Sequence, residues 1–206
     1  MSAARKSHWE HVYSTKDPTE VSWYEGAPKR SLQMIAATGV KSDAAIIDVG
    51  GGASTLVDNL LDAGFDDVTV LDVASAALAY TRARLGDVAE TITWIEQDVL
   101  QFNPDQPYRL WHDRAVFHFL TEKDQQQHYV DVLQRAVEPG GHVILATFGP
   151  NGPERCSGLP VQCYSIDQMA DVLGPGFELR AHDLEEHNTP TGSIQQFLYA
   201  WWQAKA

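Results

Sequence analysis

Short apolar runs alternate with amphipathic stretches from residue 44 onward. Runs of four to seven mainly apolar residues are typical of strands, and runs without polar alternation are typical of strands buried in a parallel sheet. The predicted strands are Ala45–Val49, Val68–Leu71, Thr91–Ile95, Tyr108–His112 and His142–Phe148.

The stretches between these runs have the spacing and the end signals of helices. Gly64 and Gly86 follow two of them, as expected of helix C-caps. Thr121 is the expected N-cap of a long helix that stops at Pro139. Ser165 forms the start of a capping box for a last helix. The predicted helices cover about Ser31–Ala37, Ser54–Ala63, Ser75–Leu85, 122–138 and the segment after Ser165.

Two further strands are predicted near the end of the chain, at Phe177–Leu184 and Ile194–Trp202, joined by a turn around Thr189–Gly192. The connection is too short for a helical crossover, so this pair is antiparallel. Five strand–helix units followed by a hairpin predict an α/β fold, a doubly wound sheet of seven strands with mixed directions.

The first thirty residues differ from this pattern. Trp9, Val12 and Tyr13 are spaced as on one helical face, and Trp23 and Tyr24 follow after a proline-containing loop. We expect residues 1–30 to form an aromatic flap and residues 31–206 to form the main domain.

Composition and charge limit the possible functions. The 206 residues suffice for one domain, and no apolar run approaches the roughly 20 residues that cross a bilayer. The polar N-terminus has no secretion signal, so we expect a cytoplasmic protein without a membrane partner. The formal net charge of −13 disfavours nucleic acid as a partner. Cys156 and Cys163 are expected to be reduced thiols.

Candidate chemistry gathers where three strands meet their helices. Gly50, Gly51 and Gly52 follow the first strand, where doubly wound sheets bind ligands and where glycine lets the backbone approach them. Asp72 ends the second strand, where a carboxylate can accept hydrogen bonds from both hydroxyls of a ribose. Asp98 follows the third strand, where it can accept a hydrogen bond from an adenine amino group. The fingerprint of nicotinamide-binding domains would need a third glycine at position 55, where this sequence has Thr55. This sequence therefore lacks the fingerprint.

Together these residues resemble the class I S-adenosylmethionine-dependent methyltransferase superfamily, from about Ser31 to Gln203. The resemblance implies a Rossmann-like sheet of order 3-2-1-4-5-7-6 with the last strand antiparallel, and S-adenosyl-L-methionine as cofactor. The implied cofactor contacts are Asp48, Gly50, Gly51, Gly52, Ser54 (where many members have glycine), Asp72, Val73, Asp98, Val99 and Asp113.

The N-terminal segment is similar to segments in two subfamilies, lysine methyltransferases of elongation factors and small thiol or metalloid methyltransferases. In both, such a segment folds over the cofactor. We therefore expect Trp9, Tyr13 and Trp23 to contact the cofactor, where a cation over an aromatic ring is favourable. Tyr24 is expected to orient the acceptor and is a candidate catalytic residue.

The segment after the fourth strand lies where an acceptor is expected. His118, with Asp113, is the candidate catalytic group, and His112 is a second candidate base or acceptor contact; the alternative for each histidine is a packed, hydrogen-bonded ring. Arg114 either clamps an acceptor carboxylate or forms a salt bridge. The Gly- and Pro-rich loop after the fifth strand, with Arg155 and Cys156, is expected to line the acceptor pocket.

The sequence therefore predicts a methyltransferase whose acceptor is a small-molecule nucleophile, with a thiol or other soft nucleophile favoured. Two alternatives stay open: a protein lysine N-methyltransferase acting on a basic protein, and a non-catalytic S-adenosylmethionine-binding module. No metal site is expected, although two thiols in one loop leave room for a soft metalloid as acceptor.

Overall fold

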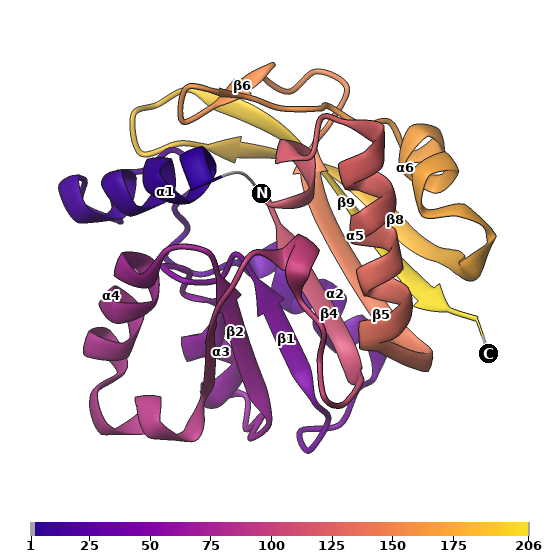
Figure 1. Cartoon of the computed structure of the whole chain (residues 1–206), viewed down its shortest axis with the longest axis horizontal. Coiled ribbons are helices and arrows are strands. Elements are labelled where there is room, and N and C mark those ends of the chain that lie inside the picture. Colours follow the sequence, from indigo (N-terminus) through magenta and orange to yellow (C-terminus); the bar gives the residue numbers. More distant parts are fainter. Residues whose placement is uncertain (1–2, 206) are drawn as a thin grey trace.

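The computed structural model describes residues 3–205 and contains one seven-stranded sheet (Figure 1). The strand order is β3-β2-β1-β4-β5-β9-β8, in which β9 is antiparallel to both of its neighbours and the first five strands are parallel. This confirms the predicted order, with β8 and β9 as the sixth and seventh strands. The bounds are β1 (Ile46–Val49), β2 (Val68–Asp72), β3 (Thr93–Glu96), β4 (Tyr108–Arg114), β5 (Val137–Phe148), β8 (Phe177–Asn188) and β9 (Ile194–Ala204).

Helices cover both faces of the sheet, each over its own apolar core. One core packs the side chains of α5 and α6 against the sheet, and the other packs those of α2, α3 and α4. Neighbouring residues of a strand belong to different cores, as Ile46 and Ile47 of β1 do, because side chains alternate between the two faces. The helices are α1 (Ala3–Thr15), α2 (Lys29–Thr38), α3 (Leu56–Asp62), α4 (Ser75–Leu85), α5 (Lys123–Ala136) and α6 (Ile166–Leu173).

Several element ends differ from the sequence prediction. The N-cap of α5 is Glu122 rather than Thr121, and it makes no capping hydrogen bond through its side chain. Helix α5 ends at Ala136, because Val137 is already extended and pairs with Tyr108. The capping box at Ser165 is confirmed. Gly86 is the C-cap of α4, whereas α3 is capped by Ala63 and Gly64 follows with a φ of 86°.

A small hairpin of β6 (Arg155–Cys156) and β7 (Leu159–Pro160) interrupts the loop after β5 and was not predicted. Its two-residue turn has positive φ at both Ser157 and Gly158, the conformation of tight hairpin turns. The hairpin brings Cys156 into the interior. In residues 3–205 no helix is long and apolar enough to cross a membrane.

Candidate functional site

The glycine turn after β1 is tightly surrounded by side chains. Gly50 has a φ of 73°, and a Cβ atom there would lie 2.1 Å from a methyl group of Val116. A Cβ at Gly51 would lie 2.1 Å from Asp48 Oδ2, and one at Gly52 would lie 2.7 Å from Asp72 Oδ2. Only glycine fits at these three positions without displacing its neighbours, so the turn brings bare backbone to the carboxylates that end β1 and β2.

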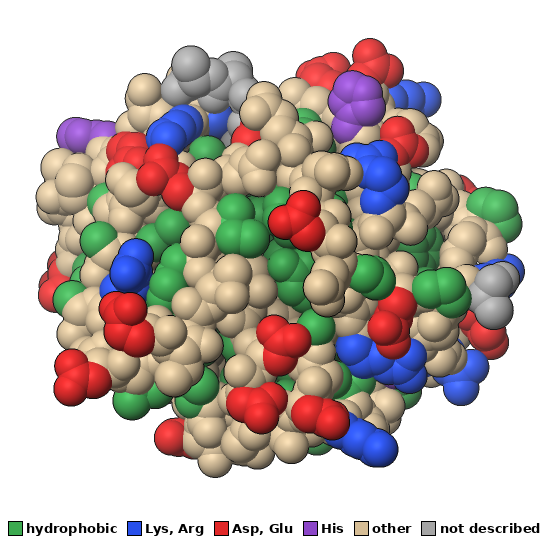
Figure 2. All heavy atoms as spheres, turned by 60° about the horizontal axis from the view of Figure 1, so that its bottom comes forward, with side chains coloured by type: hydrophobic (Ala, Val, Ile, Leu, Met, Phe, Trp, Pro, Cys, Tyr) green, Lys and Arg blue, Asp and Glu red, His purple; other side chains and the backbone are tan. Residues whose placement is uncertain are grey.

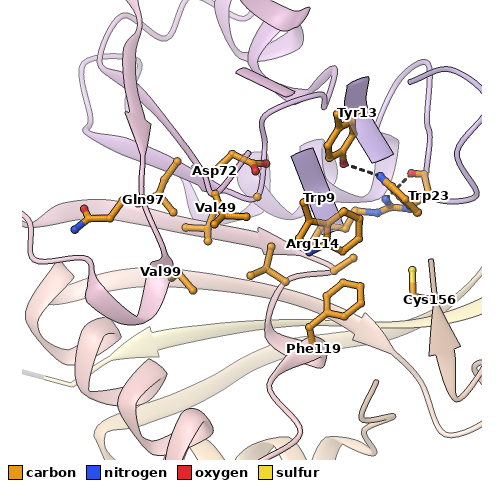
Figure 3. A pocket seen from close by; sticks show the side chains of 15 residues that line it. Trp9, Tyr13, Trp23, Val49, Asp72, Gln97, Val99, Arg114, Phe119 and Cys156 are labelled. Atoms are coloured by element: carbon orange, nitrogen blue, oxygen red, sulfur yellow. Dashed lines mark hydrogen bonds between the residues drawn. The ribbon is translucent and has the colours of Figure 1, made fainter. Parts of the chain in front are cut away.

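Two cavities adjoin this turn. The aromatic cavity has an empty volume of about 640 Å³, which includes the solvent at its open side. In Figure 3, Val49, Asp72, Gln97 and Val99 lie on one side of it and Trp9, Trp23, Phe119 and Cys156 on the other. Its lining is completed by Tyr13, Gly50, Leu71, Val73, Arg114, Ala115 and Val116.

The second cavity, which we call the His112 cavity, shares a wall with the first. The shared residues are Tyr13, Trp23, Val49, Gly50 and Arg114. Its other lining residues are Pro18, Val21, Tyr24, Glu25, Pro28, Ser31, Asp48, Gly51, Ala53, Ser54, Thr55, Leu56 and His112. The predicted contacts Tyr24, Ser54 and His112 therefore lie at this cavity.

Asp72 is placed at the aromatic cavity by backbone hydrogen bonds. Its Oδ2 accepts from the Gly52 amide at 3.0 Å and its Oδ1 from the Ala74 amide at 2.8 Å. Burial raises the pKa of Asp72 to about 6, and the backbone hydrogen bonds oppose that rise. Each carboxylate oxygen can accept more than one hydrogen bond, so Asp72 can still receive ligand hydroxyls.

Helix α1 forms a roof over the aromatic cavity. Glu10 accepts hydrogen bonds from the backbone amides of Ser75 and Ala76, at 2.7 and 3.2 Å, and thereby caps α4 from outside. Lys6 pairs with Glu96 at the end of β3, and His8 contacts Ser157 at the tip of the β6–β7 hairpin. The roof is therefore held on three sides.

The aromatic side chains under this roof pack against one another. Trp9 meets Trp23 and Phe119 edge-on, with ring centroids 5.6 and 5.2 Å apart, and stacks on Tyr13. The Trp23 indole donates a hydrogen bond to the Tyr13 hydroxyl at 3.3 Å. Rings from α1, from the segment that follows it and from the turn after β4 thus line one side of the cavity.

A hydrogen-bonded chain of three buried side chains lines the His112 cavity. Asp48 and His112 are paired neighbours on β1 and β4, so their side chains lie on the same face of the sheet. His112 Nδ1 lies 2.7 Å from Asp48 Oδ1, and His112 Nε2 lies 2.9 Å from Ser31 Oγ. Both ring nitrogens of His112 are engaged, which agrees with the hydrogen-bonded alternative stated above.

Arg114 stands between the two cavities and holds the N-terminal segment. Its guanidinium donates to the Trp23 carbonyl and to the Tyr199 hydroxyl, each at 2.8 Å, and lies 3.3 Å from Glu25 Oε1. It also packs over the Phe197 ring. The salt bridge expected as the alternative for Arg114 is therefore present, with Glu25 as partner.

The position of Asp113 differs from the one predicted, which was a contact with cofactor or acceptor. It faces the opposite side of the sheet from His112, where it accepts hydrogen bonds from the amides of Val116 and Phe117 and from the Tyr129 hydroxyl. Burial raises its pKa to about 6. Asp113 lines neither cavity, so its geometry supports a structural role in the turn after β4 rather than contact with cofactor or acceptor.

His118 also lies outside both cavities, contrary to the catalytic role predicted for it. Its ring is fully buried between Phe119 and Phe148, and its Nδ1 accepts from the Phe148 amide at 3.3 Å. Burial lowers its pKa to about 3, and nearby Arg114 contributes. A neutral ring enclosed in this way cannot reach a ligand in either cavity.

The loop after β5 contributes only part of what was predicted. Cys156 lines the aromatic cavity, and burial raises the pKa of its thiol to about 12. Arg155 is exposed, bonds to the Gly158 carbonyl and lines neither cavity, which corrects its predicted acceptor contact. Both cysteines are free, and among residues 3–205 no group of His, Cys, Asp or Glu could hold a metal ion.

In the segment after β3, one residue caps a turn and its two neighbours line the aromatic cavity. Asp98 caps the short 3-10 turn Val99–Gln101, accepting from the Leu100 amide at 3.0 Å. The residues on either side of it, Gln97 and Val99, line the aromatic cavity. The contact predicted between Asp98 and an adenine amino group stays a prediction.

Several site residues were missed at the sequence level. Glu10 and Glu25 are ordinary acidic residues in a polar segment, and Phe119 reads as a core residue. The sequence predicts Ser31 only as the start of a helix. The one signal available was the density of aromatic residues before residue 30, which indicated a flap without showing what would hold it.

On the face that Figure 2 shows, acidic side chains are spread widely and basic ones lie scattered among them, in keeping with the net charge of −13. A polyanion would be repelled by such a surface.

Comparison with known proteins agrees with this geometry. Residues 46–141 match a family model described as a methyltransferase domain. The chain is 25% identical to EEF1A lysine methyltransferase 2 of Danio rerio, over 92% of this chain and 81% of that protein.

Two solved structures illustrate the likeness of fold. One, described as "Conversion of a Disulfide Bond into a Thioacetal Group during Echinomycin Biosynthesis", has a TM-score of 0.79 at 18% identity and covers 98% of this chain and 93% of that one. The other is the N-methyltransferase NodS of Bradyrhizobium japonicum in complex with S-adenosyl-L-homocysteine. Its TM-score is 0.73 at 15% identity, with 98% of each chain covered.

Proposed function

Because this chain belongs to the class I S-adenosylmethionine-dependent methyltransferase superfamily, we propose that it transfers a methyl group from S-adenosyl-L-methionine to a small-molecule nucleophile. A thiol or another soft nucleophile is the favoured acceptor. The observation that carries the choice of a small acceptor is the aromatic cavity that α1 covers with Trp9 and Tyr13.

The residues present fit the cofactor. The glycine turn has no room for side chains, and Asp48 Oδ2 beside it is buried without a hydrogen-bond partner among the described residues. Asp72 accepts from two backbone amides and lines the cavity next to Val73. Asp72 would receive the ribose, the apolar side with Val73 and Val99 the adenine, and the turn at Gly50 the methionine portion.

The cofactor supplies an electrophilic methyl group on a sulfonium. The protein then has to bind the acceptor, exclude water and aim its lone pair. Trp9, Trp23 and Phe119 contribute apolar surface for this, and helix α1, held by Glu10, covers part of the cavity.

The lining of the aromatic cavity favours an acceptor that brings its own lone pair. Among its described lining residues the one carboxylate is Asp72, which we assign to the ribose. Burial raises the pKa of both Cys156 and Tyr13, and Arg114 is a guanidinium, so none of these is a base near neutral pH. A thiol that ionises in solution meets this requirement, and its soft sulfur suits an apolar wall.

A titration followed by an acceptor screen tests the proposal. We expect S-adenosyl-L-methionine and S-adenosyl-L-homocysteine to bind the wild type at micromolar concentration in calorimetry, and Asp72→Ala to abolish that binding. Transfer of labelled methyl groups to apolar thiols, without transfer to basic peptides, is the expected second result. Absence of binding, or transfer to peptides alone, would refute the proposal.

A protein lysine methyltransferase is the second candidate, favoured by the likeness to EEF1A lysine methyltransferase 2 over most of the chain and by the acidic surface. A lysine side chain would need a carboxylate near its ammonium group. Glu25 is a candidate carboxylate at the His112 cavity, but it is paired with Arg114. Methylation of a lysine-containing peptide at a rate above that of any thiol would favour this candidate.

A further inference from the structure

Ser31, His112 and Asp48 form a continuous hydrogen-bonded chain with almost no exposed surface. Their exposed fractions are 0%, 2% and 2%. The chain runs from the first turn of α2, through β4, to the end of β1, where the glycine turn begins. It therefore connects the element after the N-terminal segment with the floor of the site.

The hydrogen-bond partners determine which atoms carry the protons in the chain Ser31–His112–Asp48. A carboxylate only accepts hydrogen bonds, so the hydrogen between His112 and Asp48 belongs to Nδ1. In the neutral ring Nε2 is then an acceptor, and the Ser31 hydroxyl donates to it. Both ends of the imidazole are held, so the ring cannot turn, and Asp48 is held through Oδ1.

The other carboxylate oxygen of Asp48 is not held by a hydrogen bond of this kind. Oδ2 is buried without a hydrogen-bond partner among the described residues, and Asp48 lines the His112 cavity beside Gly51. A buried carboxylate oxygen without a donor is unfavourable unless a ligand supplies one. A cationic N–H group is the donor that binds a carboxylate most strongly.

We propose that His112 and Ser31 are positioning residues that aim the Asp48 carboxylate at the α-ammonium group of the methionine portion of the methyl donor. This inference rests on the proposed function, because it needs that donor in the site. It gives His112 a role in cofactor selectivity in place of the acceptor contact expected from the sequence.

Two variants of His112 test its hydrogen bond to Asp48 separately from its hydrogen bond to Ser31. The amide nitrogen of His112→Asn stands where Nδ1 stands and still donates to Asp48. The longer His112→Gln places its amide near Nε2, where it meets Ser31, and leaves Asp48 without its donor. Both variants remove the ring, so they are matched for the loss of packing.

The experiment measures ligand affinity, with ligands that cannot donate a methyl group. Calorimetry compares S-adenosyl-L-homocysteine with its analogue that carries hydrogen in place of the α-amino group, for each variant. We expect the wild type to prefer the amino ligand by about tenfold or more. His112→Asn keeps this preference to within about threefold, and His112→Gln loses about tenfold of it.

Other results would contradict the inference in distinguishable ways. If His112→Gln weakens both ligands by the same factor, His112 has only a structural role. If the wild type binds both ligands equally, Asp48 does not receive the ammonium group, although the proposed function stands. Failure of the wild type to bind either ligand would overturn the proposed function and this inference together.

Ser31 provides a second route if the His112 variants do not fold. Ser31→Ala removes only the hydroxyl at the far end of the chain, and we expect the preference for the amino ligand to fall about threefold. Ser31→Thr keeps a hydroxyl and should restore it. Equal preference in wild type and Ser31→Ala would show that the chain does not transmit an effect from α2.

Discussion

Asp72 shows how burial couples a single residue to ligand binding. Burial raises its pKa to about 6, so the free protein binds a proton there before the unfolded chain does, whose aspartate has a pKa near 3.8. The stability that this proton contributes is present below about pH 4 and is lost as the pH rises through 6. Ligand binding has the opposite dependence, because ribose hydroxyls need the carboxylate as acceptor.

We therefore predict that the affinity for S-adenosyl-L-homocysteine is constant above about pH 7 and falls as the pH is lowered through about 6. Asp72→Asn should bind weakly at every pH and lose this dependence. Calorimetry from about pH 8 to pH 5 measures both proteins. An equal fall in the two would assign the titration to another group.

For Asp113 we predict an effect on stability rather than on ligand affinity. Asp113→Asn keeps the shape of the side chain but turns an NH₂ group toward donors, because the carboxylate accepts from two backbone amides and from Tyr129. The expected loss is about 1–3 kcal/mol of unfolding free energy, measured by urea denaturation. The affinity for S-adenosyl-L-homocysteine should change little. A large loss of affinity in a folded variant would restore the cofactor contact predicted from the sequence.

The contrast between Asp72 and Asp113 marks how far sequence can predict this site. Both carboxylates end or follow a strand beside the same ligand edge, and the sequence treats them alike. Alternation along β4 sends His112 and Asp113 to opposite faces, yet which face carries the cavity depends on where α1 and α5 pack. Position along the sheet was predictable, whereas the contacts that separate a ligand-binding acid from a structural one were not.

At the scale of elements, the roof depends on one capping contact between helices. Glu10→Ala leaves the first amides of α4 without their acceptor, which costs about 0.5–2 kcal/mol. We predict faster hydrogen exchange across α1 in this variant, with unchanged exchange in β1 and β4, and weaker binding of S-adenosyl-L-homocysteine.

Lys6→Ala is the matched control on the same helix. The Lys6–Glu96 pair is about half exposed on both sides, and exposed pairs contribute about 0–1 kcal/mol. Its removal should leave exchange in α1 nearly unchanged. Equal effects of the two variants would mean that Glu10 has no special part in holding the roof.

Elements with a strong apolar pattern were predictable, and those defined by pairing were not. The five parallel strands and the capping box at Ser165 were found because apolar runs and caps are local signals. The start of β5 at Val137 and the continuation of β8 to Asn188 depend on partners, Tyr108 and Ile194, that are distant or across a turn. The two-residue strands β6 and β7 are too short to show any period.

For the whole molecule, the acidic charge and the cavity under α1 favour different acceptors. A formal charge of −13 attracts basic proteins, as a lysine methyltransferase would require. The roof, the paired state of Glu25 and the apolar wall favour a small acceptor that reaches the methyl group inside the cavity. Long-range charge acts on the approach of a partner, whereas the cavity acts on the transfer itself.

Ionic strength separates these two acceptors, because salt screens charges that lie farther apart than about 10 Å at 0.1 M. With an aryl thiol as acceptor, which reacts as its thiolate, we predict that kcat/KM does not fall between roughly 50 and 500 mM NaCl, because the acidic surface repels the anion and salt screens that repulsion. A basic peptide acceptor would instead lose at least about tenfold over that range, since its association depends on the field of the acidic surface. Such a loss, seen with a peptide that is methylated faster than any thiol, would assign the surface rather than the cavity as the determinant of the acceptor.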